Sequence, residues 1–401
     1  MPGRLIPQTW SYDPTINAPN AYRRACTYGA FVPDELSSLL VHLDGQLAGV
    51  VSEAEHSTRQ LNDTGGPALD PLARLLLRTE SIASSKVEGM QLGVRELARA
   101  EAKAESGITP SPTVLELLGN IDAMVLAVED AAKTEVFTVA EIVAIHRRLI
   151  ERSTNRRIAG QIRTQQNWIG GNDYNPCGAD FVPAPPEEVG RLLADLCSAI
   201  NDETLPPLVQ AALVHAQFET IHPFHDGNGR TGRALVHVVL RRRGIAPRFL
   251  PPISVIFAGA RDRYIAGLTR FRADGVGAWI EQFAAATSRA ARLARAYIDA
   301  VRSLQERWRE QVRAAEKAPR ADATAWTIID VLPAHPMISA PVATAVTNRA
   351  KGRVYEAIDQ LVAAGVLVPL SESRRNRWWE AVGLLDLVAE LEAGELPRPG
   401  R

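Results

Sequence analysis

Apolar residues recur along most of the chain at spacings of three and four, which predicts a mainly α-helical protein. One short, well-bounded helix is expected over 71–88, because Pro71 suits a first helical position and Gly89 suits a helix stop. A long helix is expected over 278–315, where apolar side chains continue at this spacing up to Trp308. Further helices are predicted over 113–133, 138–152, 186–202, 207–219 and 235–243.

Two stretches interrupt the helical pattern. Residues 1 to about 30 are rich in Pro, Tyr and Asn and show little periodicity, so we expect them to form an irregular arm. Residues 161–183 contain Gly170-Gly-Asn-Asp173 between β-prone residues, which indicates a hairpin or an extended flap.

The C-terminal part has a different pattern. Its predicted elements are, in order, helices over 326–332, 340–346 and 348–364, a strand over 366–370, a polar turn over 371–376 and a strand over 377–382. Three helices followed by a hairpin is the order of a winged-helix module.

Length and composition set the scale of the fold. A chain of 401 residues exceeds what one hydrophobic core usually organises, so two or three domains are expected. With 46% hydrophobic and 23% charged residues, the composition is typical of a soluble globular protein and excludes wholesale disorder. The predicted organisation is an N-terminal arm over 1–34, a helical region over 35–110, a central core over 111–290, a long helix with a linker over 291–322, and a winged-helix-like domain over 323–401.

Charge and cysteine content indicate which partners and which cellular location to expect. Lys and Arg total 45 against 46 acidic residues, so no overall field draws the protein to nucleic acid or to an anionic membrane. The sequence has no signal-peptide core and no apolar run long enough to span a bilayer, and no membrane partner is expected. Cys26, Cys177 and Cys197 lie far apart and form neither a CxxC pair nor an even disulfide framework, so we expect a reducing, cytoplasmic location.

The segment richest in chemistry is His222-Pro-Phe-His-Asp-Gly-Asn-Gly-Arg-Thr-Gly-Arg233. Gly227 and Gly229 lie where a helix begins, and the exposed backbone N–H groups and the helix dipole at such a site favour a phosphate. Asp226 offers the hard oxygen ligand that Mg²⁺ prefers when it also binds phosphates. The histidine four residues earlier can take up a proton near neutral pH and act as a general base.

Two arginines complete this segment. Arg230 and Arg233 fall three residues apart on the new helix, so their guanidinium groups can bind phosphate oxygens from one face. The alternative is a polar helix–turn–helix junction with a capping Asn228, a structural aspartate and a core histidine. Each element alone would favour that alternative, whereas the whole set in one continuous run favours a phosphate site.

The run 222–233 resembles the HxFx[D/E]GNGRxxR signature of the Fic-domain adenylyltransferases, and it matches at every specified position. The resemblance extends over roughly residues 35–290. It implies a mainly α, Fic-type helical core with a β-hairpin flap. It also implies a Mg²⁺-dependent enzyme that transfers AMP from ATP to a hydroxyl on a protein.

The resemblance assigns roles to the residues of the run. His222 would deprotonate the hydroxyl that attacks the α-phosphate of ATP, and Asp226 would hold Mg²⁺ between the α- and β-phosphates. The loop would be anchored in the core by Phe224, and His225 receives no role. The residues expected to contact the phosphates are Gly227, Asn228, Gly229, Arg230 and Arg233.

An upstream segment, Ser84-Ser-Lys-Val-Glu-Gly89, is similar to the inhibitory-helix motif [S/T]xxxE[G/N] of Fic proteins. Ser84 and Glu88 are four residues apart and therefore share one helix face. By the resemblance, Glu88 would pair with Arg233 and block the γ-phosphate position, which would leave the resting enzyme autoinhibited. The alternative is an ordinary helix end with a surface glutamate.

The flap and the nucleotide base complete the comparison with the family. Segments 160–171 and 181–186 resemble the family's flap, whose edge could hold a target peptide by main-chain pairing; a plain surface hairpin is the alternative. One departure is Ala260, because the family often has an Asn directly before the position of Arg261. Tyr264 is expected to line the base, and the choice of ATP over other nucleotides follows from the resemblance alone.

The predicted winged-helix module carries a local basic face. It consists of Arg349, Lys351, Arg353, Arg374, Arg375 and Arg377. DNA binding through residues 323–382 and a solvated or protein-contacting face both stay open.

Two other functions stay open for the whole chain. One is a related reaction on the same fold, either γ-phosphate transfer or the removal of AMP from a protein. Because the Doc-like loop that transfers phosphate lacks the GNGR arrangement, AMP transfer is favoured. The other is a nucleotide-sensing, DNA-binding regulator. The expected partners are ATP and a protein with a Ser, Thr or Tyr hydroxyl, which includes the chain itself, and both a homodimer and a single chain stay open.

Overall fold

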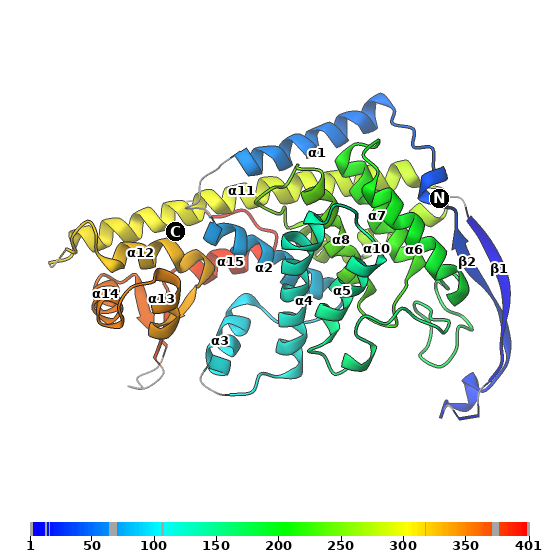
Figure 1. The fold of residues 1–401 in the computed structure, drawn as a ribbon, viewed down its shortest axis with the longest axis horizontal. Helices are drawn as coiled ribbons and strands as arrows, with labels where there is room; N and C mark the ends of the chain where they lie inside the picture. The colour runs from blue at the N-terminus through cyan, green and yellow to red at the C-terminus, as the bar shows by residue number, and fades with distance from the viewer. Residues whose placement is uncertain are drawn as a thin grey trace. The chain divides into compact units, whose positions relative to one another are not determined.

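The computed structural model describes residues 3–12, 14–15, 17–63, 70–105, 108–316, 318–370 and 377–398, and for residue 105 the backbone alone. Within them the chain is mainly α-helical, as predicted (Figure 1). It divides into two compact units. The first unit is Met1–Glu55, Asp122–Ile245 and Arg261–Ala285, and the second is His56–Ile121, Ala246–Ala260 and Ala286–Arg401. The domain boundaries expected from the sequence stay predictions.

The helices and strands closely follow the predicted pattern in the middle of the chain. The first unit contains β1 (Gly3–Trp10), β2 (Cys26–Pro33), α5 (Val139–Ile150), α6 (Pro186–Asn201), α7 (Pro207–Ile221), α8 (Asn228–Arg242) and α10 (Arg261–Arg272), with short 3₁₀ turns η1 (Asn20–Tyr22), η2 (Leu36–Ser38), η4 (Ala131–Lys133) and η5 (Arg156–Ile158). The unit boundaries fall inside α1 (Gly45–Asp63), α4 (Pro112–Glu129) and α11 (Val276–Ala314).

The second unit contains the remaining elements. These are α2 (Asp70–Val87), α3 (Val94–Glu105), α9 (Ile253–Gly259), α12 (Thr324–Val331), η6 (Leu332–Ala334), β3 (Met337–Ser339), α13 (Ala340–Thr347), α14 (Lys351–Ala363), β4 (Leu367–Pro369), β5 (Trp378–Ala381) and α15 (Leu384–Glu392).

Helix α7 forms the centre of the first unit. All of its residues from Leu208 to Ile221 are buried, as expected for a helix that is apolar on every side. Helix α8 packs closely against it at Gly232, where a Cβ atom would lie 2.7 Å from Glu219 Oε1 and 3.0 Å from Phe218 Cδ1. A larger residue would force the two helices apart, so this glycine keeps the end of α7 and the start of α8 together.

The N-terminal arm is a regular hairpin, and the prediction of irregular structure was wrong. Strands β1 and β2 pair antiparallel from Gly3 opposite Pro33 to Trp10 opposite Cys26 (Figure 1). Proline disrupts a central strand because it lacks an N–H donor, but an edge strand tolerates it. Pro7 lies in β1, which is the edge strand here, so the proline content does not exclude a sheet.

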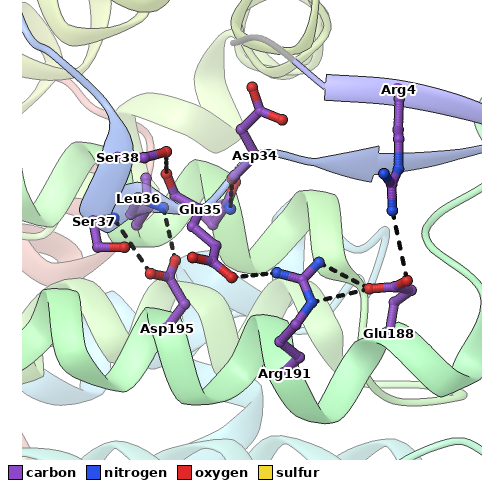
Figure 2. Close-up of polar contacts among 10 residues, drawn as sticks. Arg4, Asp34, Glu35, Leu36, Ser37, Ser38, Glu188, Arg191 and Asp195 are labelled. Atoms are coloured by element: carbon purple, nitrogen blue, oxygen red, sulfur yellow. Dashed lines mark hydrogen bonds and ion pairs between the residues drawn. The ribbon is translucent and has the colours of Figure 1, made fainter.

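Acidic and basic side chains attach the end of β2 to α6 (Figure 2). Asp195 accepts a hydrogen bond from the backbone N–H of Leu36 at 2.7 Å, which satisfies the start of η2. Arg191 contacts both Glu35 and Glu188. Because those three side chains are partly exposed, the buried contact of Asp195 is the one that contributes most to stability.

The flap over 161–183 is an extended loop with a single bridge that pairs Ile169 with Phe181. It lies against the N-terminal hairpin, because the N–H of Phe31 donates to the carbonyl of Val182 at 2.9 Å. Three aromatic pairs join hairpin and flap: Trp10 with Trp168, Tyr22 with Tyr174, and Phe31 with Phe181.

A disulfide also connects hairpin and flap, which the sequence did not predict. Cys26 at the start of β2 is bonded to Cys177 in the flap, with their Cα atoms 6.0 Å apart across 151 residues of sequence. The expectation of unpaired cysteines was therefore wrong for these two, since the spacing along the chain does not report proximity in space. Cys197 is free, and burial raises the pKa of its thiol to about 12. The cytoplasmic location stays a prediction, without support from these cysteines.

The C-terminal module, which we define as residues 324–392, has the predicted helices α12, α13 and α14 and the predicted strands β4 and β5. The sequence missed β3, which pairs with β5 and completes a three-stranded sheet in the order β3-β5-β4, and it also missed α15. The proposed wing turn 371–376, with Arg374 and Arg375, lies outside the described residues. The winged-helix class and DNA binding stay predictions.

Among the described helices, none combines the length and the apolar character that crossing a membrane would require.

Candidate nucleotide-binding site

The segment between α7 and α8 reverses the chain sharply. Helix α7 ends at His222, which adopts a left-handed conformation with φ 50° and ψ 59°. A non-glycine residue in this region costs on the order of 1–3 kcal/mol, and the proline that follows restricts His222 further. Gly227, also left-handed with φ 79°, ends the reversal, and α8 begins at Asn228. The neighbouring structure must hold this conformation.

Arg163, near the start of the flap, holds the start of the reversal. Its Nε donates to the carbonyl of His222 at 2.9 Å, and its Nη2 donates to the carbonyls of Ala184 at 2.5 Å and Ile221 at 3.3 Å. The backbone N–H of Arg163 donates to the carbonyl of Pro223 at 2.9 Å. Burial lowers the pKa of Arg163 to about 10, which still leaves it charged at neutral pH. A rigid, charged fork is suited to collecting several carbonyl groups at once.

Two asparagines fix the next part of the loop. Asn167 Nδ2 donates to the carbonyls of His222 at 3.2 Å and Phe224 at 2.8 Å. The side chain of Asn228 closes a ring with Phe224, since its Oδ1 accepts the backbone N–H at 2.9 Å and its Nδ2 donates to the carbonyl at 2.7 Å. The amide of Asn228 is therefore used within the loop, and its backbone N–H is the group that can contribute to an anion site.

His146 of α5 supports the loop from the other side. Its ring stacks on that of Phe224, with centroids 3.7 Å apart and planes 3° apart. Its Nδ1 accepts the backbone N–H of Gly160 at 3.0 Å, so Nε2 carries the proton that it donates to the carbonyl of Asp226 at 2.9 Å. Burial lowers the pKa of His146 to about 4, so the ring is neutral near pH 7. It acts as a fixed spacer between α5 and the loop.

Gly227 lets the loop approach α5 closely. A Cβ atom at this position would lie 3.0 Å from Leu149 Cδ2 and 3.1 Å from Ile150 Cδ1, in addition to the unfavourable φ. The N–H groups in the first turn of a helix have no acceptor inside that helix. Directly after Gly227, the first turn of α8 therefore forms a concave backbone surface that favours an anion.

Asp226 presents its carboxylate at the rim of this surface. Its side chain is 44% exposed, and Oδ1 accepts the N–H of Gly227 at 2.6 Å while Oδ2 accepts Asn155 Nδ2 at 3.2 Å. A cavity of about 780 Å³ opens beside it, lined by Ser153, Thr154, Asn155, Arg156, Arg157, Ile158, His225 and Asp226. The carboxylate is thus oriented by two donors and still accessible to a ligand.

Arg230 and Arg233 lie in the first two turns of α8, and both are buried. Arg230 Nη2 lies 3.5 Å from Asp226 Oδ1, and its side chain is 7% exposed. The guanidinium group of Arg230 therefore places positive charge beside the start of the helix, where the helix dipole is also positive.

Comparison with known proteins agrees with this geometry. Residues 136–240 match the Fic/DOC family, and residues 51–129 match the N-terminal segment described as Fic/DOC family N-terminal. Residues 136–240 are a Fic domain. Together with the segment before it, the Fic domain covers the loop, α5 and the helix that carries Ser84.

Relatives of known name share only part of their length with this chain. The protein adenylyltransferase fic-1 of Caenorhabditis elegans is 36% identical over 117 residues, which are 28% of this chain and 21% of the relative. The protein adenylyltransferase Fic of Nematostella vectensis is 34% identical over 139 residues, 33% of this chain and 28% of the relative. The chain therefore spans about a quarter of the length of these relatives.

Solved structures support the fold. A Fic family protein from Desulfovibrio desulfuricans G20 superposes with a TM-score of 0.52 over 86% of this chain and 98% of that chain, at 18% identity. A Fic domain containing signaling protein from Bacteroides thetaiotaomicron gives a TM-score of 0.50 over 61% of this chain and 95% of that chain, at 22% identity. At such identities the likeness concerns the fold.

The structure brings most of the predicted site residues together. The residues from His222 to Arg233 form one continuous loop and helix start in the Fic domain. Tyr264 is 4% exposed, and its hydroxyl is 2.9 Å from His215 Nε2. The contact of Tyr264 with the base stays a prediction. In the second unit, Ser84 is buried within α2, and Glu88 lies in the exposed turn that follows.

Sequence reasoning missed the residues that hold the loop. His146 lies on the buried side of a predicted helix, where a lone histidine resembles any core histidine, and Arg163 lies in the predicted flap among mostly polar neighbours. Their role follows from distances in the folded chain.

Proposed function

We propose that this protein transfers AMP from ATP to a Ser, Thr or Tyr hydroxyl of a protein. One observation carries the proposal. A single short reversal of the chain contains His222, the accessible carboxylate of Asp226 and the first turn of α8. A base, a metal ligand and an anion site side by side are the parts that phosphoryl-type transfer needs.

In the proposed reaction His222 takes the proton of the target hydroxyl as its oxygen attacks the α-phosphorus of ATP. The bond from that phosphorus to the bridging oxygen of the β-phosphate breaks, and pyrophosphate leaves. The backbone N–H groups at Asn228 and Gly229, with Arg230 and Arg233, would bind the phosphates and the negative charge that develops on the leaving group. The strained backbone at His222, held by Arg163, would keep the imidazole aimed at the attacking oxygen.

The residues present fit Mg²⁺. This ion takes hard oxygen ligands, commonly one or two carboxylates together with substrate phosphates and water. Asp226 supplies one accessible carboxylate, oriented by Gly227 and Asn155. When bound, Mg²⁺ would neutralise phosphate charge next to this carboxylate.

We also propose that Glu88 restrains the enzyme by pairing with Arg233. The support is the motif itself: Ser84 lies near the end of α2, Glu88 follows in the turn directly after the helix, and Gly89 has φ 86°. A glutamate that takes the guanidinium of Arg233 would compete with the γ-phosphate for the same donors.

The proposal is tested with the variant Glu88→Gly, incubated with Mg²⁺ and ATP labelled on either the α- or the γ-phosphate. We expect label on protein from α-labelled ATP only, faster than in the wild type, and lost in the double variant with His222→Ala. Label from the γ-position would establish phosphate transfer instead. Release of AMP from a modified protein that requires Glu88 would establish the reverse reaction.

A regulator is the remaining alternative. It would be supported if His222→Ala retained the full biological effect of the wild type and bound DNA with sequence preference.

A further inference from the structure

Carboxylates of the C-terminal module bind basic side chains on both sides of the turn that carries Glu88. Glu392, the last residue of α15, accepts Lys86 Nζ at 2.9 Å in the last turn of α2. The turn with Glu88 follows Lys86 and leads to α3. Helix α15 therefore holds the α2 side of this turn.

The contact between Glu392 and Lys86 is mostly buried. The side chain of Glu392 is 4% exposed and that of Lys86 is 27% exposed. Burial raises the pKa of Glu392, whereas Lys86 lowers it. A buried carboxylate is strongly unfavourable without a partner, so losing Lys86 would force this part of the structure to rearrange.

A second set of contacts connects the α3 side of the turn to the same module. Arg95, in the first turn of α3, donates to Glu380 of β5 at 2.6 Å and to Asp386 of α15 at 2.9 Å. The sheet and the last helix of the C-terminal module therefore both hold the start of α3.

Backbone hydrogen bonds shape the turn itself. The N–H groups of Glu88 and Met90 both donate to the carbonyl of Ser85 at 3.1 Å, and Gly89 donates to that of Lys86 at 2.9 Å. With a left-handed glycine at its centre, this short segment joins two helices that the C-terminal module holds.

We infer that the C-terminal module sets the strength of the restraint that Glu88 exerts, and that Glu392 is the positioning residue through which it does so. A partner or ligand that moves α15 would loosen the turn and release the enzyme. The inference rests on the proposed restraint by Glu88. It gives the module a regulatory role that does not require DNA binding.

The test uses the full chain with Glu392→Gln, which keeps the size of the side chain but removes its charge, and with Lys86→Met, which removes the basic partner. The matched control is Glu356→Gln, which breaks an exposed pair with Arg353 in the same module. We expect transfer from α-labelled ATP to rise at least fivefold in both test variants and to stay within twofold of the wild type in the control.

The same substitutions are repeated in the Glu88→Gly background, and hydrogen exchange is measured over residues 87–94. We expect no further activation in that background, and faster exchange of the turn in Glu392→Gln with the rest of the chain unchanged.

Three outcomes would overturn the inference. The first is no activation by Glu392→Gln while Glu88→Gly activates. The second is equal activation by Glu392→Gln with and without Glu88. The third is activation without any change in exchange at the turn. If Glu88→Gly itself fails to activate, the restraint is wrong and the inference falls with it, whereas label transfer that still depends on His222 would leave the proposed reaction intact.

Discussion

Replacing His146 with alanine should disable the loop without touching a residue that contacts the substrate. The ring fills the space between α5 and the loop, is fully buried, and serves one donor and one acceptor of the backbone. Its loss would leave the N–H of Gly160 and the carbonyl of Asp226 without a partner. Each buried backbone group left unsatisfied costs about 1–3 kcal/mol, and the lost stacking on Phe224 costs about 0.5–1.5 kcal/mol more. We expect destabilisation of about 2.5–7.5 kcal/mol.

The assay is urea unfolding followed by tryptophan fluorescence, together with the initial rate of transfer in the Glu88→Gly background. The transfer rate should fall on the order of 100-fold, since a displacement near 1 Å in a reacting group has that effect. His225→Ala is the matched control, because His225 lies three residues from the catalytic histidine but is exposed. His146→Asn should be intermediate, since its Oδ1 can still accept the N–H of Gly160. A stability loss below 1 kcal/mol for His146→Ala, or one equal to that of His225→Ala, would refute the role of His146.

Three other predictions follow from contacts in the first unit. Cys26→Ser opens a loop of 151 residues, which should lower the free energy of unfolding by about 5 kcal/mol in the chain-entropy account. A reductant should lower the urea midpoint of the wild type to that of the variant and leave the variant unchanged. A wild type whose urea midpoint does not respond to the reductant would contradict the disulfide. Tyr264→Phe should lower the free energy of unfolding by about 1–2 kcal/mol through the lost contact with His215, while nucleotide affinity stays within twofold of the wild type. A tenfold loss of nucleotide affinity at unchanged stability would instead support the predicted contact with the base. The ring of His146 should titrate near pH 4 in an NMR titration, well below its ordinary 6.5. Because this folded-state pKa is depressed, the contribution of the neutral His146 ring to stability is full above about pH 6.5 and is lost as the pH falls toward 4. The loss is about 2 kcal/mol at pH 5. A titration of His146 near pH 6.5 would refute the depressed pKa.

The spacing of apolar residues was enough to predict the helices, because a helix with one buried face carries an apolar residue every three or four positions. The helix expected over 71–88 is Asp70–Val87, and the one expected over 278–315 is Val276–Ala314. The N-terminal hairpin was not predicted, because a proline in a strand is acceptable only at an edge and the sequence does not reveal which strands are edges.

The candidate site also has one part that the sequence predicts and one part that it does not. The loop from His222 to Arg233 was predictable because its chemistry depends on neighbours in the sequence. The contacts of His146, Arg163 and the disulfide depend on residues between 14 and 151 positions away, so no local pattern carries them.

The attachment of the hairpin to the flap matters for anyone who trims this protein. A fragment cut at residue 35, where the family resemblance starts, would lose Cys26 along with the aromatic partners of Trp168 and Phe181. The remaining thiol of Cys177 and the uncovered rings would then face water. Such a fragment would retain every catalytic residue and yet be prone to aggregation and to cross-linking through that thiol, so its low activity would say little about the intact enzyme.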